Sequence, residues 1–469
     1  MTTETEQQGS RGGFSTKLGL VLAAAGSAIG LGNIWRFPTE TGEYGGSAFL
    51  LVYLICILVF GLPLMIAEFT VGRAARSSTG NAYAILAPKT SWKFIGLAST
   101  LTAFLILGYY NVVAGWTLFY LGEAAAGSFV SMSSQTAADG SNVFAESFGA
   151  FVSNPWKPIV CLVLFMAFTH VVITAGVKKG IERFSKLMMP LLFIIMLFLC
   201  GCSFTMPGFR KGMEFLFAPD FDKIDAKVVR SALAQCFYSF SLAMGCICTY
   251  ASYFRADANL AKTAVSVGAM DTLAAVLAGI VIFPAVFSVP GLEPDSGAKL
   301  VFIALPNVFD SALAGVPVLS WLVSCLFYLL LVIATVTSTV SLHEVITSYV
   351  SEHWGFSRTK SAWIVSILCV ILGVICSLSM GPYLGDIKVA GMNIFDLFDF
   401  VTAQLMLPIT GIFISIFVGW KMNRDTLMRE LTSGGNCSGT AWLYKPLVFI
   451  LRFIAPIIIA WIMIAAFLD

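Results

Sequence analysis

The feature that most constrains this chain is a series of long apolar stretches separated by short polar segments. A helix needs about 20 apolar residues to cross the hydrocarbon of a bilayer. Eleven stretches meet that length, at residues 17–41, 47–72, 92–124, 157–175, 184–205, 229–253, 263–289, 318–350, 361–380, 394–420 and 442–467. The sequence therefore predicts an all-α polytopic membrane protein with eleven transmembrane helices.

The composition excludes several classes of protein. Of the 469 residues, 58% are hydrophobic and 12% are charged, and the formal net charge is +2. Soluble chains carry about 25% charged residues, so an ordinary soluble enzyme and a disordered chain are both excluded. The small net charge gives no basic face for a nucleic acid. The expected partner is the lipid bilayer, and the oligomeric state is left open.

The distribution of basic residues predicts the orientation. Lys and Arg near the ends of spans are retained in the cytoplasm. Alternate loops are rich in them, whereas loop 127–154 contains none. We therefore expect the plasma (inner) membrane, with residues 1–16 and loop 421–441 in the cytoplasm. Loop 206–228, whose basic residues are offset by acidic ones, and the C-terminus are expected outside.

Two predicted spans contain residues that interrupt a helix. Small residues recur through 26–33 in the first span, where the sequence is GSAIGLGN, and through 239–245 in the sixth, where it is SFSLAMG. Equivalent helices in the two halves are five spans apart. Because five is an odd number, they cross the membrane in opposite directions, so the two halves would be inverted. Paired interruptions in inverted halves are typical of a transporter site at the middle of the membrane, although small residues also serve close helix packing.

Several motifs in order resemble the neurotransmitter:sodium symporter family. They are GLGNIWRFP at 30–38, GLPLM at 61–65, a tyrosine pair at 109–110, KGIERF at 179–184, TYASY at 249–253 and ATVTS at 334–338. The resemblance runs from about Arg11 to the end of the chain. It implies a LeuT-like fold of two inverted five-helix repeats, 17–205 and 229–420, with an eleventh span at 442–469. Many relatives have a twelfth span, and the eleven-span form resembles bacterial amino-acid:sodium symporters.

The resemblance implies two sodium sites and no organic cofactor. The first site, called Na1, would use Ala28, Asn33, Ser239 and Asp271. The second, called Na2, would use carbonyls of Gly26, Ile29 and Ala334 with the hydroxyls of Thr337 and Ser338. Sodium prefers oxygen ligands, which a broken helix supplies. Alternatively, Thr337 and Ser338 bond back to carbonyls of their own helix.

Asp271 carries a separate expectation. A carboxylate at mid-membrane costs about 2.5–3.5 kcal/mol even on lenient scales, so it should pair with a cation or be protonated. Many relatives have asparagine here and, one turn later, a serine beside which chloride helps neutralise the sodium ion. This chain has Asp271 and Ala275. We therefore expect transport without chloride; the alternative is a protonated aspartic acid in a helix contact.

The substrate implied is a zwitterionic amino acid. Its carboxylate would bind the amides of Leu31 and Gly32 and the hydroxyl of Tyr110, at the positive end of a half-helix. Its ammonium and side chain would contact the remaining residues of the pocket, which are Ala28, Ile106, Tyr238, Ser239, Ser241, Met244 and Leu342. Met244 is deformable and suits aromatic rings, which favours a large hydrophobic or aromatic substrate.

Charged pairs on both sides of the site match the family's gates. Arg36 and Asp399 would form the outer pair, and Arg11 and Glu352 the inner pair. Arg11 could also be a simple cytoplasmic anchor. We expect Glu68 to support the unwound first helix by hydrogen bonding.

The predicted function is sodium-coupled symport of a hydrophobic or aromatic L-amino acid into the cell by alternating access. The alternatives are a proton-coupled amino-acid carrier on the same fold and an amino-acid-sensing membrane receptor. An enzyme is not expected, because the chain has no nucleophile elbow, metal-ligand cluster or phosphate loop.

Overall fold

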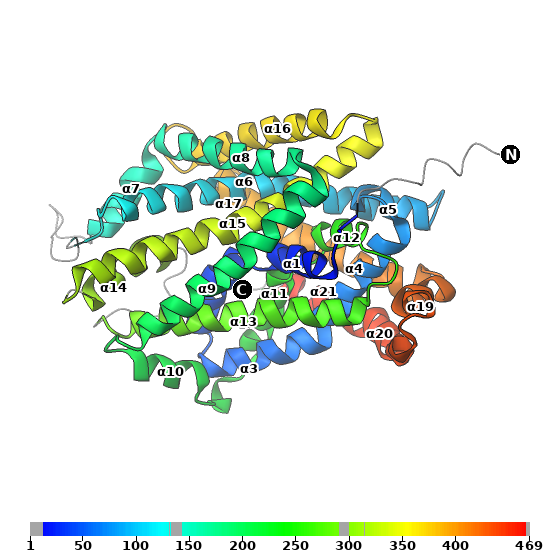
Figure 1. The fold of residues 1–469 in the computed structure, drawn as a ribbon, viewed down its shortest axis with the longest axis horizontal. Coiled ribbons are helices and arrows are strands. Elements are labelled where there is room, and N and C mark those ends of the chain that lie inside the picture. Colours follow the sequence, from blue (N-terminus) through cyan, green and yellow to red (C-terminus); the bar gives the residue numbers. More distant parts are fainter. Residues whose placement is uncertain (1–12, 131, 133–142, 290–299, 314, 466–469) are drawn as a thin grey trace.

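The computed structural model describes residues 13–130, 132, 143–289, 300–313 and 315–465. In these residues the regular structure is helical, apart from an isolated antiparallel bridge between Val389 and Met392. Figure 1 shows an elongated bundle in which the long helices run roughly parallel to the longest axis.

The first five predicted spans are all helical, and three of them contain segments of π-helix. They consist of α1 (Lys17–Ala28), η1 (Gly32–Arg36) and α2 (Phe37–Glu43); α3 (Ser47–Cys56), η2 (Ile57–Gly61) and α4 (Leu62–Ala75); α6 (Lys93–Ala125); α8 (Lys157–Thr174); and η4 (Val177–Glu182) with α9 (Arg183–Ser203). Helix starts follow capping chemistry, since the side chain of Thr16 accepts a hydrogen bond from the Gly19 amide at the start of α1.

The remaining predicted spans are helical as well. They consist of α11 (Ala226–Ser239) and α12 (Cys246–Ala251); α13 (Leu260–Val286); α15 (Pro317–Trp354); α16 (Arg358–Ser379); α17 (Ile394–Phe400), η7 (Val401–Met406), α18 (Leu407–Ile416) and η8 (Phe417–Lys421); and η10 (Ser438–Leu443), α20 (Tyr444–Phe449), η11 (Ile450–Ile454) and α21 (Ala455–Ala465). The side chains of Asp225 and Asn259 cap α11 and α13.

Among the described residues, nine helices are long and apolar enough to cross a membrane, and α1 with η1–α2 adds a pair bent by 53°. The predicted sixth span, 229–253, lies over α11 and α12, which are 14 and 6 residues long and separated by a break. All eleven predicted stretches are thus helical, while the number of membrane crossings stays a prediction.

The surface of the bundle is strongly apolar. Leu58, Leu164, Leu197 and Ile457 each expose more than half of their surface, at 66%, 56%, 60% and 69%. Soluble monomers rarely expose contiguous apolar patches of more than a few hundred Å². These side chains belong to different spans, so the outer face suits hydrocarbon on several sides.

The connecting segments also contain helices, which gather at the two ends of the bundle. They are α5 (Thr79–Leu86), α7 (Val143–Ser153), α10 (Phe209–Phe217), η5 (Phe221–Lys223), η6 (Leu300–Ala304), α14 (Leu305–Ala312), α19 (Arg424–Leu431) and η9 (Ser433–Gly435). In Figure 1, α5 and α19 lie at one end of the bundle, and α7, α10 and α14 lie at the other. This grouping agrees with the predicted loops 421–441 and 206–228 lying on opposite sides.

Close helix packing gives the first testable prediction. A Cβ added at Gly72 on α4 would lie 1.9 Å from the backbone oxygen of Cys248 on α12, whereas one at Gly122 on α6 would meet nothing within 4 Å. Overpacking costs about 1–3 kcal/mol. We expect Gly72→Ala to lower the apparent melting temperature of the purified protein by several degrees. Gly122→Ala, the matched control, should leave it unchanged or raise it, and equal effects of the two changes would contradict the packing argument.

Candidate functional site

The first span breaks between α1 and η1. Ile29 ends α1 in an extended conformation, with φ −74° and ψ 107°. The break needs a glycine, because a Cβ on Gly30 would lie 2.5 Å from the hydroxyl oxygen of Ser338 on α15. The Gly30 amide donates instead to the side-chain oxygen of Asn33, at 3.0 Å. The predicted interruption at 26–33 is therefore present.

The sixth span breaks between α11 and α12, over residues 240–245. Ser241, Ala243 and Gly245 all have positive φ, at 51°, 65° and 83°. A non-glycine residue in this conformation costs about 1–3 kcal/mol and persists only where its surroundings enforce it. The Ser241 hydroxyl donates to the Ser27 carbonyl at the end of α1, at 2.8 Å. This bond joins the two broken spans directly.

Glu68 on α4 supports the break in the sixth span. Its side chain is fully buried, and its Oε1 accepts a hydrogen bond from the Ala243 amide, at 2.6 Å. We expected Glu68 to support the first span, and this expectation is wrong as to the helix served. The reason is geometric: α4 packs against α12, which follows the break in the sixth span.

A cavity of about 70 Å³ lies between the two breaks. Its lining contains every predicted substrate-contact residue except Ser239, namely Ala28, Leu31, Gly32, Ile106, Tyr110, Tyr238, Ser241, Met244 and Leu342. Gly30, Tyr109, Cys246 and Ser338 also line it and were not among the predicted contacts. The Leu31 amide points towards the Tyr110 hydroxyl, with 3.5 Å between nitrogen and oxygen. The Leu31 amide and the Tyr110 hydroxyl thus lie side by side in the wall of the cavity, and both are donors of the kind that a carboxylate accepts from.

The side chains predicted for Na1 converge beside this cavity. Asn33 donates its amide to Oδ1 of Asp271 at 2.8 Å and to the Ser239 hydroxyl oxygen at 3.0 Å. Ser239 donates to Oδ2 of Asp271 at 2.8 Å, and Tyr53 donates to the same oxygen at 3.3 Å. Asp271 and Asn33 are fully buried, and Ser239 is nearly so. Neutral groups thus surround a carboxylate whose charge would attract a cation.

Tyr53 was not among the site residues expected from the sequence. It lies within the apolar run of α3 and is fully buried. A tyrosine in such a run is usually a packing residue, so only its distance to Asp271 reveals it as part of the site. Cys246 was missed for a similar reason, since it has the character of a small buried hydrophobe.

The residues predicted for Na2 face one another across α1 and α15. A Cβ on Gly26 would lie 3.5 Å from the Cβ of Thr337. The hydroxyls of Thr337 and Ser338 donate to the Ala334 carbonyl, at 2.9 and 3.2 Å. The bonds to their own helix expected as the alternative are therefore present. Each hydroxyl donates through hydrogen and keeps oxygen lone pairs, so these bonds are compatible with holding a cation.

The outer pair differs in detail from the expected one. Arg36 binds Glu40 one turn along its own helix, with 3.2 Å between Nε and Oε1, and its guanidinium lies 4.3 Å from the ring centre of Tyr238. Among the described residues, Asp399 forms no direct ion pair with Arg36 and attracts it only at longer range. Glu40 reaches Arg36 because side chains four residues apart share a helix face. The resemblance to the family's gates did not indicate Glu40 as a partner of Arg36.

Of the inner pair, Arg11 lies outside the described residues. Glu352, near the end of α15, accepts hydrogen bonds from the hydroxyls of Ser77 and Ser78, at 2.6 and 2.7 Å, and from the Ser78 amide at 2.9 Å. Glu352 therefore joins the C-terminal end of α15 to the segment that precedes α5.

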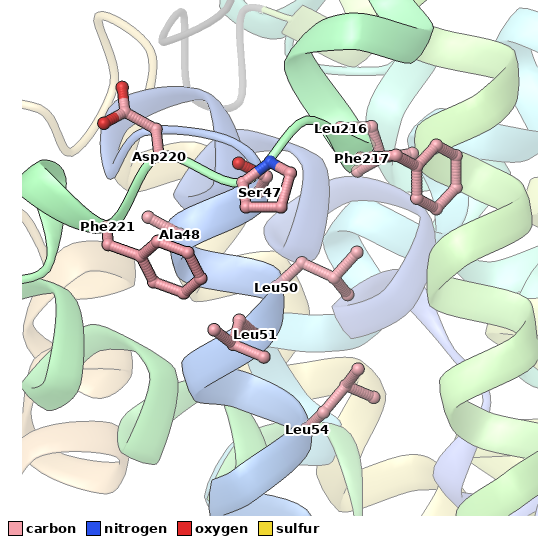
Figure 2. A pocket seen from close by; sticks show the side chains of 10 residues that line it. Ser47, Ala48, Leu50, Leu51, Leu54, Leu216, Phe217, Asp220 and Phe221 are labelled. Carbon is pink, nitrogen blue, oxygen red and sulfur yellow. The ribbon is translucent and has the colours of Figure 1, made fainter.

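Two larger hollows contain few polar groups. One, of about 200 Å³, lies between α3 and residues 216–221, and Figure 2 shows Leu50, Leu51, Leu54 and Phe221 around it. The other, of about 450 Å³, is lined mainly by apolar residues of α6 and α18. Neither has the convergent donors and acceptors that a zwitterion needs, so size alone does not identify the site.

The fold and the site together define a class: a membrane transporter with its pocket between two broken helices. The sequence profile of the Sodium:neurotransmitter symporter family matches residues 11–138 and 140–469. The chain therefore belongs to this family; it is a sodium-dependent, multi-pass membrane transporter and not an enzyme.

Individual relatives agree with this assignment. The chain is 35% identical over 447 residues to the uncharacterized sodium-dependent transporter YhdH of Bacillus subtilis, covering 95% of each. It is 32% identical over 476 residues to an uncharacterized sodium-dependent transporter of Haemophilus influenzae, covering 99% of each. The crystal structure of MhsT in complex with L-phenylalanine superposes with a TM-score of 0.86 at 41% identity, over 97% of this chain and 100% of MhsT. The predicted LeuT-like fold is thereby confirmed.

Proposed function

We propose that the protein couples sodium influx to uptake of a hydrophobic or aromatic L-amino acid by alternating access, without chloride. One observation carries the proposal: the side chains of Asn33, Ser239 and Asp271 meet beside a pocket between two broken helices. The ion and the substrate carboxylate would then lie next to each other, so that each stabilises the other. This shared contact would make binding of one favour binding of the other.

The pocket supports an amino acid rather than a simple amine. The amides of Leu31 and Gly32 begin η1, where the positive end of a helix dipole favours a carboxylate, and Tyr110 adds a hydroxyl. Ile106, Met244 and Leu342 give the opposite wall an apolar, partly deformable surface. The L-phenylalanine in the MhsT complex is in keeping with this substrate class.

In the proposed cycle, sodium binds at both Na1 and Na2 and the substrate binds from outside. Tyr110 and Tyr238 cover the substrate, and the region of Arg36 and Asp399 closes above it. Spans 1, 2, 6 and 7 then rock against the others, and the region near Glu352 and Arg11 opens to the cytoplasm. Moving one charge across 100 mV yields about 2.3 kcal/mol, enough to drive accumulation. The orientation is the one predicted from the basic loops, with the N-terminus inside and the C-terminus outside.

A binding screen tests the substrate class. Purified protein would be titrated with each of the twenty amino acids, with sodium or with choline in its place. Tryptophan, tyrosine, phenylalanine and leucine should bind only with sodium, and glycine and charged amino acids should bind weakly. Strong binding in choline buffer, or a preference for charged substrates, would contradict the proposal.

The sodium requirement tests Na1. Asn33→Ala and Asp271→Ala each remove oxygen ligands, and Asp271→Ala also removes the buried charge. We expect both to raise the sodium concentration for half-maximal uptake by about tenfold or more, because each loses an oxygen that would contact a charged ion, and a polar contact to a charged group is worth about 1.5 kcal/mol. Glu214→Gln is the control, since Glu214 is 61% exposed on α10. Unchanged sodium dependence in both alanine variants would rule out this site.

Chloride dependence tests the role proposed for Asp271. Replacing chloride by gluconate should change the uptake rate of the wild-type protein little, because the carboxylate supplies the negative charge beside sodium. In the double variant Asp271→Asn with Ala275→Ser, which introduces the pair found in many relatives, uptake should fall in gluconate. Strict chloride dependence of the wild type would disprove the assignment.

A further inference from the structure

The argument starts from one arginine inside the last span. Arg452 is the third residue of η11, and it lies seven residues, or about 10 Å along a helix, beyond Lys445 at the start of that span. An arginine in a membrane span is costly unless it finds a partner or reaches the interface. In the described part of the chain, no carboxylate forms an ion pair with Arg452. Its charge is therefore left for a ligand outside the protein.

The position of the guanidinium is fixed by η8. Nε of Arg452 donates to the Gly419 carbonyl, and the guanidinium carbon lies 5.0 Å from the ring centre of Trp420. The indole nitrogen of Trp420 donates back to the Arg452 carbonyl, at 3.4 Å. The stem of Arg452 packs on Gly419, which has no side chain to displace it. Two nitrogens of the fork remain for an outer partner.

Further cations surround the same end of the span. Lys421 ends η8, which packs against both α20 and η11, and Lys445 lies in the first turn of α20. The guanidinium of Arg424 lies 5.5 Å from the ring centre of Tyr444. We call Lys421, Arg424, Lys445 and Arg452 the basic cluster. None of the four forms an ion pair within the described residues.

Acidic residues do little to neutralise this cluster. Glu430 is engaged by the buried Arg73, with 2.6 Å between Oε2 and Nε, and also faces Arg429 at 3.7 Å. Asp425 is exposed, and its backbone amide donates to the side chain of Asn423, which caps α19. One free carboxylate therefore stands against four cations, which selects an anionic ligand.

Apolar residues below the cluster favour a lipid. Phe449, Phe453, Ile457 and Ile464 are 56%, 45%, 69% and 54% exposed, and they form a stripe along one side of the span. Above them Trp420 is 57% exposed and Trp442 is 71% exposed. Tryptophans of this kind mark the level of the headgroups. The stripe would take acyl chains, and the cluster would take the phosphate.

We propose that the basic cluster and this stripe form a binding site for an anionic phospholipid of the inner leaflet, with Arg452 and Lys445 holding its phosphate. Basic pockets between spans on the cytoplasmic side have the chemistry to bind such headgroups. A second copy of the chain is a poorer occupant. A twofold contact would bring the same patch of both copies together, and four cations on each would repel.

Lipid titration followed by native mass spectrometry tests the site on the full-length protein in detergent. Phosphatidylglycerol is compared with phosphatidylcholine of the same chains. Each basic residue near an anionic surface contributes about fivefold in affinity. Wild type should bind phosphatidylglycerol at least about fivefold more tightly than phosphatidylcholine. Arg452→Gln should lower the affinity for phosphatidylglycerol about fivefold. Arg452→Lys should keep most of it.

Two further variants keep the test decisive. Lys445 is exposed, so the variant Lys445→Gln should fold normally even if Arg452→Gln does not. Its affinity for phosphatidylglycerol should also fall about fivefold. Arg210→Gln is the control, because Arg210 is 90% exposed at the opposite end of the molecule. The proposal is overturned if Lys445→Gln and Arg452→Gln bind phosphatidylglycerol like wild type. It is also overturned if inorganic phosphate alone competes fully, or if the face instead forms a dimer that Arg452→Gln abolishes.

Discussion

The structure depends on satisfying backbone groups where no water is available. Each break in a membrane helix frees N–H and C=O groups, and one left unpaired costs several kcal/mol. Side chains satisfy the freed groups in both breaks. The pairs are Gly30 N–H with Asn33, the Ser27 carbonyl with Ser241, and Ala243 N–H with Glu68. Gln235 adds a second bond, at 2.8 Å, to the Gly32 carbonyl, which also accepts from the Phe37 amide. Without these partners, the breaks would leave buried N–H and C=O groups unpaired.

The same partners shape the chemistry of the site. Asn33 uses its oxygen for the Gly30 amide and its nitrogen for Asp271, so one side chain both holds the break open and orients the carboxylate. Ser241 lines the pocket while binding Ser27. Structural and functional demands therefore fall on the same few residues, and a change at any of them affects both.

Much of the fold could be predicted because its signals are local. Apolar length gives the spans, and the small residues at 26–33 and 239–245 give the breaks, to within a few residues. The site was less accessible. Tyr53 and Gln235 act through contacts between distant segments, and their residue types are unremarkable in their own spans. Glu68 could be recognised as a buried acid, but only the packing of α4 on α12 decides which break it serves.

Charged partners were the least predictable part. Arg36 pairs with Glu40 in its own helix and interacts with Asp399 only at longer range, and spacing alone does not rank them. Arg452 carries no family motif, and its unpaired state emerges only once the surrounding segments are in place.

The two proposed ion positions differ in which parts of the molecule they join. Asn33, Ser239 and Asp271 belong to spans one, six and seven, which would travel together, so a cation among them stays inside one moving body. Gly26 and Thr337 belong to spans one and eight, on either side of the sliding boundary. An ion there would hold the mobile and the stationary parts of the molecule together, and its release would allow them to move relative to each other.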